Sequence, residues 1–394
     1  MVITVGWILI VLPVALIVYT YLVYPALLRM LARHPAPLST NSRDLPLVSI
    51  VVPAYNEEAQ IRGAIEALIA QDYPASRRQI LILSDASTDR TDEIVSSYAA
   101  QGVELLRMPE RSGKTAAENA SCALLRGDII INTDASIRLH PSCARHLVEA
   151  MSDERVGVAS SRDVSVSRES GSANAAEAGY VGYEMRIRAL ETQTGGIVGA
   201  SGSGYAIRAT LHRLPVRADL SRDFSAALTA RTHGYMAVSV DDALCYVPRT
   251  TSLKAEYRRK VRTIARGVET LLHNNHLLNP FRFGMFSWKL LSHKVCRWLV
   301  PASAVPGLLG LMILATYHLW ADILFFAVVG VSLVALVGAL WPTGKPMPRP
   351  LSILTFSVAA NIAVVHALTR VVIGHEDHVW EPTRRAVPVE SRGP

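Results

Sequence analysis

The sequence predicts an α/β domain with a largely parallel sheet, carried between apolar segments long enough to cross a membrane. Apolar strand-like runs alternate with helical patterns from residue 48 onward. Polar loops rich in acidic residues follow the first of these runs. Uncharged stretches lie on both sides of this region. Because strands that alternate with helices form βαβ units, we expect a layered domain whose strands run mostly in one direction.

The apolar excess of the chain is concentrated in uncharged stretches, which cover residues 1–28, 298–321, 323–344 and 351–369. Each is close to the roughly 20 residues that cross a hydrocarbon core. The first has no basic start and no clear cleavage site of small residues, so we interpret it as an uncleaved anchor rather than a signal peptide. The last contains Asn361 and His366. It is therefore either a span or a re-entrant segment.

Basic residues beside the apolar stretches predict the orientation. Arg29 and Arg33 follow the first stretch, and Lys289, Lys294 and Arg297 precede the second. Because such residues mark the cytoplasmic side, we expect a multi-pass protein of the cell (inner) membrane with its large domain in the cytoplasm. The net charge of +7 is then explained by contact with membrane lipid, and we expect no nucleic-acid partner.

Two further features bear on location. Four full spans from an outside N-terminus leave the tail outside, whereas its Arg384, Arg385 and Arg392 favour the cytoplasm. The side of the tail is therefore open. The four cysteines show no paired metal-ligand spacing and suit a reducing compartment.

These observations divide the chain into consecutive regions. We expect an N-terminal anchor, a linker, a cytoplasmic domain, basic and amphipathic interface helices, a C-terminal region of two to three spans and a tail. Their ranges are 1–28, 29–47, 48–250, 251–297, 298–374 and 375–394. Within the domain we predict strands at 48–53, 79–84 and 103–107 and a strand-like run within 128–134 that ends at the Asp134 carboxylate, with helices at 58–70, 89–100 and 115–125.

Polar loops after successive predicted strands carry the chemistry. They are Pro53-Ala-Tyr-Asn-Glu57, Asp85-Ala-Ser-Thr-Asp89, Ser112-Gly-Lys-Thr115 and Thr133-Asp-Ala-Ser136. In open α/β sheets ligands bind beyond the carboxyl ends of the strands. Taken alone, the first two loops are more typical of a helix start or a capped turn than of a binding site. The Gly-Lys-Thr sequence is not a P-loop, because Met108 stands where that motif needs its first glycine.

In combination, these loops resemble those of the membrane-bound family 2 glycosyltransferases, which are inverting enzymes of EC class 2.4. The resemblance covers about residues 47–270 and includes Gly113-Lys114 with Asn119, the glycine-rich segment Gly199–Arg208 and Ser221-Arg-Asp-Phe224. It implies a GT-A fold, a Rossmann-like domain that handles nucleotide-diphospho-sugars, here flanked by transmembrane helices.

The resemblance also implies roles for the loop residues. The donor-binding set is Pro53, Tyr55, Glu57, Asp85, Lys114 and Asp134. Carboxylates suit this task because they accept hydrogen bonds from ring N–H groups and ribose hydroxyls. Asp134, with Ser136 beside it, is expected to hold Mg²⁺ or Mn²⁺ against the diphosphate, since these ions prefer hard oxygen ligands.

Asp223 is expected to be the general base, which takes a proton from the acceptor hydroxyl as that oxygen attacks. The other interpretation is a helix N-cap or a surface residue. The acceptor or diphosphate region is expected to comprise Gly199, Ala200, Ser201, Gly202, Arg222, Arg259 and Arg262. For the basic cluster around Arg259 and Arg262, contact with anionic lipid and binding of diphosphate both stay open.

The chain departs from the family pattern at three places. Ser136 stands where a second metal-binding acid is common, and Arg222 replaces the first acid of a usual acidic pair. The Gln-x-x-Arg-Trp signature of processive synthases keeps only an arginine, Arg262.

The function implied is transfer of a sugar, from a UDP-sugar or similar nucleotide-sugar donor, to a saccharide or lipid-linked acceptor at the inner face of the membrane. Cell-surface or exported polysaccharide synthesis is the expected context. The alternative is a non-catalytic scaffold that binds nucleotide-sugar within a membrane polysaccharide complex. A transporter is disfavoured, because the spans carry few ionisable residues that could pair.

Overall fold

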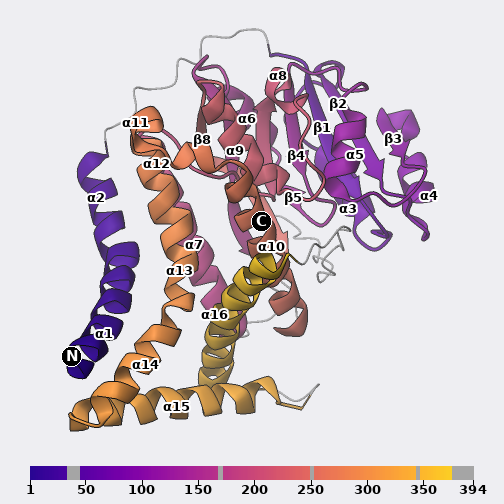
Figure 1. Ribbon diagram of the computed structural model, residues 1–394. Helices are drawn as coiled ribbons and strands as arrows, with labels where there is room; N and C mark the ends of the chain where they lie inside the picture. The colour runs from indigo at the N-terminus through magenta and orange to yellow at the C-terminus, as the bar shows by residue number, and fades with distance from the viewer. Residues whose placement is uncertain (33–44, 167–171, 249–252, 343–346, 375–394) are drawn as a thin grey trace.

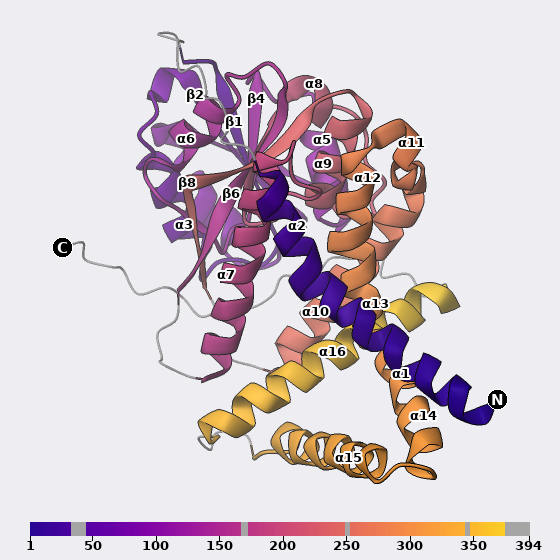
Figure 2. The same ribbon diagram turned by 90° about the vertical axis from the view of Figure 1, so that its left-hand side faces the viewer.

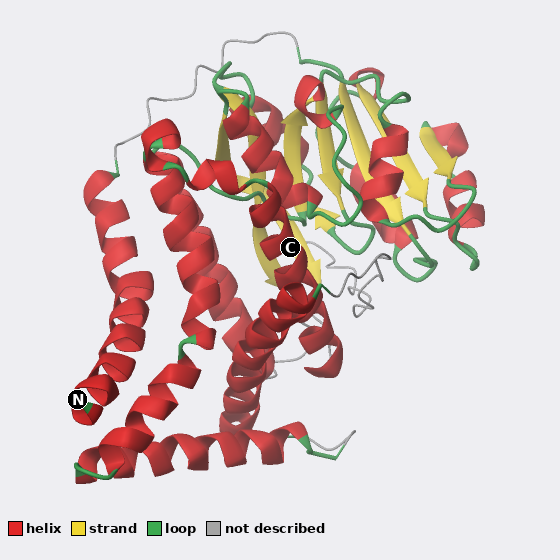
Figure 3. Cartoon of the chain, viewed as in Figure 1, coloured by secondary structure: helices red, strands yellow, loops and turns green. Residues whose placement is uncertain are grey.

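The computed structural model describes residues 1–32, 45–166, 172–248, 253–342 and 347–374. Most of the predicted linker and the whole predicted tail lie outside these ranges. The molecule consists of an α/β domain and a group of long helices that extends away from one side of it (Figure 1). All of the strands lie in the α/β domain (Figure 3).

An eight-stranded sheet forms the centre of the domain, in the order β3-β2-β1-β4-β7-β6-β8-β5. Its strands are β1 (Val48–Ala54), β2 (Arg78–Ser84), β3 (Val103–Arg107), β4 (Ile129–Thr133), β5 (Arg138–Leu139), β6 (Val156–Val166), β7 (Gly204–Arg208) and β8 (Met236–Pro248). Every residue of β1 is buried. That burial follows from its apolar run, which suits a strand paired on both edges and covered on both faces.

β7 and β5 run against the common direction of the sheet. β3, β2, β1 and β4 run parallel, as predicted. β7 is antiparallel to both of its neighbours, β4 and β6. β6 and β8 are parallel to each other and therefore follow the direction of the first four strands, whereas β5 is antiparallel to β8. The sheet is thus largely parallel, as expected, and the two reversed strands are the part that was not predicted. Gly204 at the start of β7 pairs with Thr133 at the end of β4. The chain therefore re-enters the sheet at the edge where Asp134 lies, and this brings the glycine-rich segment to that loop.

Helices cover both faces of the sheet. One face packs against α3 (Ile61–Ile69), α4 (Thr91–Ser96) and α6 (Cys143–Ala150). The other packs against α5 (Lys114–Ser121), α8 (Ala209–His212) and α9 (Arg222–Thr232). Alternate residues of β1 serve the two faces: Ile50 and Val52 belong to the first core, and Val51 belongs to the second.

Long helices join the domain to the apolar segments. They are α7 (Ser172–Gln193), α10 (Leu253–His273), α11 (Pro280–Phe283), α12 (Met285–Leu290) and α13 (Arg297–Ala302), with a π-helical segment at Leu291–Cys296 between the last two. Their outer neighbours are α1 (Val2–Val18), α2 (Tyr24–Leu31), α14 (Ala304–Ala315), α15 (Leu319–Ala339) and α16 (Arg349–Ile373). Figure 2 shows α1, α14, α15 and α16 grouped below the sheet.

Among the described residues, three helical segments are long and apolar enough to cross a membrane: Val2–Leu31, Leu319–Ala339 and Arg349–Ile373. A fourth is possible if Met285–Ala302 and α14, which are bent by 43° relative to each other, form one broken span. Their side chains expose apolar surface on many sides, as expected of helices that face lipid. These helices indicate that the protein associates with a membrane.

The helix α10 contacts both the outer helices and the α/β domain. On one face, Val261 and Ala265 pack against Ala363 and Ala367 of α16. Another part of its surface carries basic residues toward the α/β domain, where they line the cavity described below. α10 therefore stands between the outer helices and the loops at the edge of the sheet.

Candidate active site

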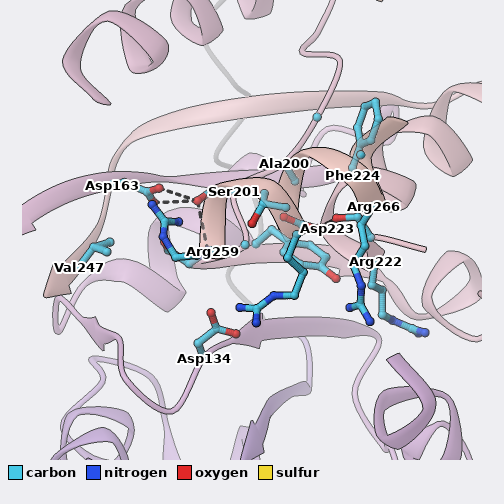
Figure 4. Close-up of a pocket in the computed structure, with 18 of the residues that line it drawn as sticks. Asp134, Asp163, Ala200, Ser201, Arg222, Asp223, Phe224, Val247, Arg259 and Arg266 are labelled. Carbon is cyan, nitrogen blue, oxygen red and sulfur yellow. Dashed lines mark hydrogen bonds between the residues drawn. The ribbon is translucent and has the colours of Figure 1, made fainter. Parts of the chain in front are cut away.

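A cavity of about 470 Å³ lies where the polar loops, α7, α10 and α13 meet. Its lining includes Glu57, Lys114, Asp134, Ser136, the segment 199–203, Arg222, Asp223, Arg259 and Arg262, so most of the predicted site residues come together here. Figure 4 shows Asp134, Asp223 and the segment bearing Ala200 and Ser201 around one cavity. Pro53, Tyr55 and Asp85 are not among its lining residues.

The first wall is formed by the Asp134 loop and the start of α5. The Nζ atom of Lys114 lies 2.5 Å from Oδ1 of Asp134. Burial alone lowers the pKa of Lys114, but the charges of Asp134 and Glu118 outweigh this effect and raise the pKa above its usual value. A fixed positive charge therefore lies beside the carboxylate at the end of β4.

Asp85 supports this wall from behind. Its carboxylate oxygens accept hydrogen bonds from the backbone N–H groups of Ser112 and Gly113, each at 2.8 Å. Gly113 has φ +88°, a conformation that favours glycine. The two bonds fix the turn that presents Lys114. Asp85 therefore has a structural role in this turn, and its role in binding the nucleoside stays a prediction.

Tyr55 and Glu57 follow β1. The guanidinium carbon of Arg111 lies 4.0 Å from the centroid of the Tyr55 ring, a cation–π arrangement. Glu57 reaches the cavity lining, whereas Pro53 is buried in the last part of β1. Arg111 was not predicted from the sequence, because an arginine in a loop carries no motif of its own.

The oxygen atoms near Asp134 determine whether the chain could hold the predicted metal ion. Among the described residues, no group of three or more His, Cys, Asp or Glu side chains is arranged to hold a metal ion. Asp134 and Ser136 nevertheless both line the cavity and offer hard oxygen atoms. Mg²⁺ is commonly held by one or two carboxylates together with waters and substrate phosphates. These residues therefore fit an ion whose other ligands come from a bound diphosphate.

The segment before β7 forms the second wall. The Ser201 hydroxyl donates to Asp163 on β6, with distances of 2.8 and 2.7 Å to the two carboxylate oxygens. The Ser201 N–H donates to the Ser160 hydroxyl at 2.8 Å. A Cβ atom at Gly202 would lie 2.9 Å from Oδ2 of Asp223. Glycine therefore allows this segment to approach the Asp223 carboxylate closely.

Asp223 lies in the first turn of α9, where a negative charge is favoured by the helix dipole. The Ser221 hydroxyl donates a short hydrogen bond to Oδ1 of Asp223. Arg222, the neighbouring residue, directs its guanidinium inward. It donates to the Asn119 side chain at 2.5 Å and to the His212 carbonyl at 2.8 Å. Its side chain is only 5% exposed but is part of the cavity lining, so its contact with acceptor or phosphate stays a prediction.

The third wall is basic and comes from α7, α10 and the π-helical segment. Its charged residues are Glu184, Arg188, Glu256, Arg259, Lys260, Arg262, Arg266 and Lys294. Arg259 pairs with Glu256 at 2.6 Å and Arg188 with Glu184 at 3.3 Å. Trp298 of α13 packs edge-on to Phe224 at 6.5 Å between ring centroids. Arg188 and Lys294 were missed by sequence reasoning, because they lie in helices without a recognisable motif.

Comparison with known proteins places the first part of this site in a family. Residues 49–209 match the model of glycosyl transferase family 2. This segment belongs to glycosyltransferase family 2. The match begins in β1 and ends just after β7, so it contains the Asp134 loop and the glycine-rich segment but not Asp223.

Two curated relatives show the extent of the likeness. The probable glycosyltransferase YdaM of Bacillus subtilis (strain 168) is 34% identical over 124 residues, which are 30% of this chain and 29% of the relative. The beta-monoglucosyldiacylglycerol synthase of Nostoc sp. (strain PCC 7120 / SAG 25.82 / UTEX 2576) is 26% identical over 287 residues, 67% of this chain and 58% of the relative. The chain thus spans 29% to 58% of the length of these relatives.

A solved structure resembles nearly the whole of this chain. The mannosyltransferase PcManGT from Pyrobaculum calidifontis, in complex with GDP-Man and Mn²⁺, superposes with a TM-score of 0.71 at 20% identity. The superposition covers 95% of this chain and 100% of that one. It shows that the predicted fold, a GT-A domain with apolar helices attached, is present.

Proposed function

We propose that the protein is an inverting glycosyltransferase. It moves a sugar from a nucleotide-sugar donor, in the first instance a UDP-sugar, to a saccharide or lipid-linked acceptor at the inner face of the cell membrane. The observation that carries the proposal is the common cavity of the Lys114–Asp134 pair and Asp223. The Lys114–Asp134 pair suits a leaving diphosphate, and the Asp223 carboxylate, elsewhere in the cavity, is suited to accept a proton.

The donor is proposed to lie against the Asp134 loop, with its base and ribose toward Tyr55 and Glu57. As the nucleoside diphosphate leaves, the ammonium group of Lys114 stabilises the negative charge that develops on its phosphates. Asp134 and Ser136 would hold Mg²⁺ or Mn²⁺ at this place. When bound there, the ion supplies Lewis-acid stabilisation of the leaving diphosphate.

Asp223 is proposed to take the proton of the acceptor hydroxyl, so that the hydroxyl oxygen attacks the anomeric carbon opposite the leaving group. The position of the basic wall is an argument for an acceptor that reaches the cavity from the membrane. Trp298 and Lys294 of this wall belong to the segment Met285–Ala302, which is one half of the bent candidate span. We accordingly propose lipid-linked saccharide or glycolipid as the acceptor class, in cell-surface or exported polysaccharide synthesis.

A donor screen tests the proposal. The full-length protein in lipid nanodiscs is incubated with individual nucleotide-sugars and a membrane lipid extract, and the lipid products are analysed by mass spectrometry. We expect one donor to yield a product heavier by one or more sugar units. Asp134→Ala should abolish that product. Nucleotide binding without donor consumption for every donor tried would instead favour the non-catalytic scaffold.

A gain of metal affinity is expected at position 136. The substitution Ser136→Asp adds a second carboxylate beside Asp134, and the charge of the ligand set tunes affinity for such ions. In the presence of UDP we expect Ser136→Asp to bind Mn²⁺ about tenfold more tightly than the wild type, as measured by electron paramagnetic resonance of free Mn²⁺. Ser136→Ala serves as the control and should bind slightly less tightly than the wild type. Equal affinity in Ser136→Asp and Ser136→Ala would place the metal elsewhere.

A further inference from the structure

A buried carboxylate that no motif pointed to lies behind the cavity. Glu118, on α5, has no exposed side-chain surface. Neither of its carboxylate oxygens has a hydrogen-bond partner among the described residues. A buried acid without hydrogen bonds lowers the stability of the fold. Such a residue needs a reason beyond packing.

The neighbours of Glu118 provide that reason. Nε of Arg222 lies 3.6 Å from Oε2 of Glu118, and the next residue along the chain is Asp223. Lys114 lies one helical turn before Glu118 on the same helix, and its Nζ atom contacts Asp134. Burial raises the pKa of Glu118, while the positive charges of Lys114 and Arg222 oppose that shift.

The charges therefore alternate in sign along a path through the protein, in the order Asp134, Lys114, Glu118, Arg222 and Asp223. Only the two ends of this path are carboxylates at the cavity. Glu118 is the middle member and belongs to neither wall. It is the link between the side that binds the diphosphate and the side that accepts the proton.

Other bonds tie the same two helices together. Arg222 donates to Asn119, which also accepts from the backbone N–H of Val216 at 3.3 Å. The Thr115 hydroxyl donates to the carbonyl of Leu220 at 3.2 Å. The first turn of α9 is therefore held against α5, and Glu118 supplies the negative charge that keeps Arg222 in this inward position.

We propose that Glu118 is a positioning residue for the transfer reaction. Through Arg222 it fixes the turn that carries Asp223, and through Lys114 it fixes the loop that carries Asp134. This inference rests on the proposed function, because its effect on rate is defined only for a transferase. Its effect on the first turn of α9 does not depend on that function.

The test compares Glu118→Gln with Glu118→Asp in the full-length protein. Glutamine keeps the size and removes the charge, whereas aspartate keeps the charge and leaves a gap. We expect Glu118→Gln to lower kcat about 10- to 100-fold with the affinity for UDP changed less than threefold. Glu118→Asp should keep more of the activity than Glu118→Gln. A residue that only filled space would give the opposite order, and that order would overturn the proposal.

Two further measurements separate this inference from the proposed function. Hydrogen–deuterium exchange of the peptide covering residues 219–228 should increase in Glu118→Gln and less in Glu118→Asp, whatever the substrate. Glu66→Gln is the control, since Glu66 lies on α3 outside the cavity; it should leave kcat and the exchange of this peptide unchanged. If exchange in Glu118→Gln equals that of the wild type, the positioning role is wrong even if transferase activity is found.

Discussion

Replacing Asp223 with asparagine is expected to lower kcat about 10²- to 10⁴-fold, the range that a positioned general base contributes. Asparagine has the same shape but cannot take up the proton of the acceptor hydroxyl. Because Asp223 belongs to a different part of the lining from the Lys114–Asp134 pair, the binding of UDP is expected to change less than threefold. Initial rates of sugar transfer at saturating donor, combined with calorimetric titration of UDP, measure the two effects separately.

The control for this experiment is Asp219→Asn. Asp219 lies four residues earlier, pairs with Arg217 at 2.8 Å and is absent from the cavity lining. Its replacement should leave kcat within twofold of the wild type. If Asp223→Asn behaves like Asp219→Asn, another group accepts the proton, and the assignment of Asp223 as the base is wrong.

The second large effect concerns stability. His293 lies between two buried carboxylates of α7: Nδ1 is 2.7 Å from Glu191 and Nε2 is 3.1 Å from Glu184. Both nitrogens donate only when the ring carries a positive charge. Burial favours the neutral form of Glu184, but the charges of His293 and Arg297 outweigh it and hold the pKa of Glu184 well below its usual range.

Replacing His293 with leucine leaves these two acids close together without the charge between them. Loss of one partner from a buried ion pair costs about 3–5 kcal/mol. We therefore expect the apparent unfolding midpoint of His293→Leu to fall by roughly 5–10 °C, as measured by intrinsic fluorescence in detergent. The comparison variant is His146→Leu, which breaks a largely exposed pair with Glu149 and should lower the midpoint by less than about 2 °C. Equal shifts for the two variants would contradict the importance of the buried network.

The loops that follow the parallel strands β1, β2 and β4 could be predicted from the sequence for a simple physical reason. Strands that run in the same direction end at the same edge, so the polar residues after β1, β2 and β4 had to meet. Local patterns fixed the ends of these strands closely; Val103–Arg107 was predicted with the bounds that the structure has. Lys114 and Asp134 were both assigned to the donor site from the sequence, but their ion pair was not predicted.

The remaining parts of the site depend on contacts that no local pattern encodes. Arg222 was assigned to the acceptor or diphosphate region through the family resemblance. Its guanidinium contacts Glu118 and Asn119, more than a hundred residues earlier, and Glu118 looks like an ordinary helical glutamate in the sequence. The antiparallel entry of β7 likewise depends on the path of the chain after α7. The position of a side chain on a helix does not reveal which distant charge it will meet.

α10 connects the cavity to the outer helices. The same helix supplies Arg259 and Arg262 to the cavity and packs Val261 and Ala265 against α16. Because α10 takes part in both contacts, a displacement of α16 is expected to move the arginines of the cavity wall as well. The shape of the cavity is therefore mechanically coupled to the position of an apolar helix long enough to cross a membrane.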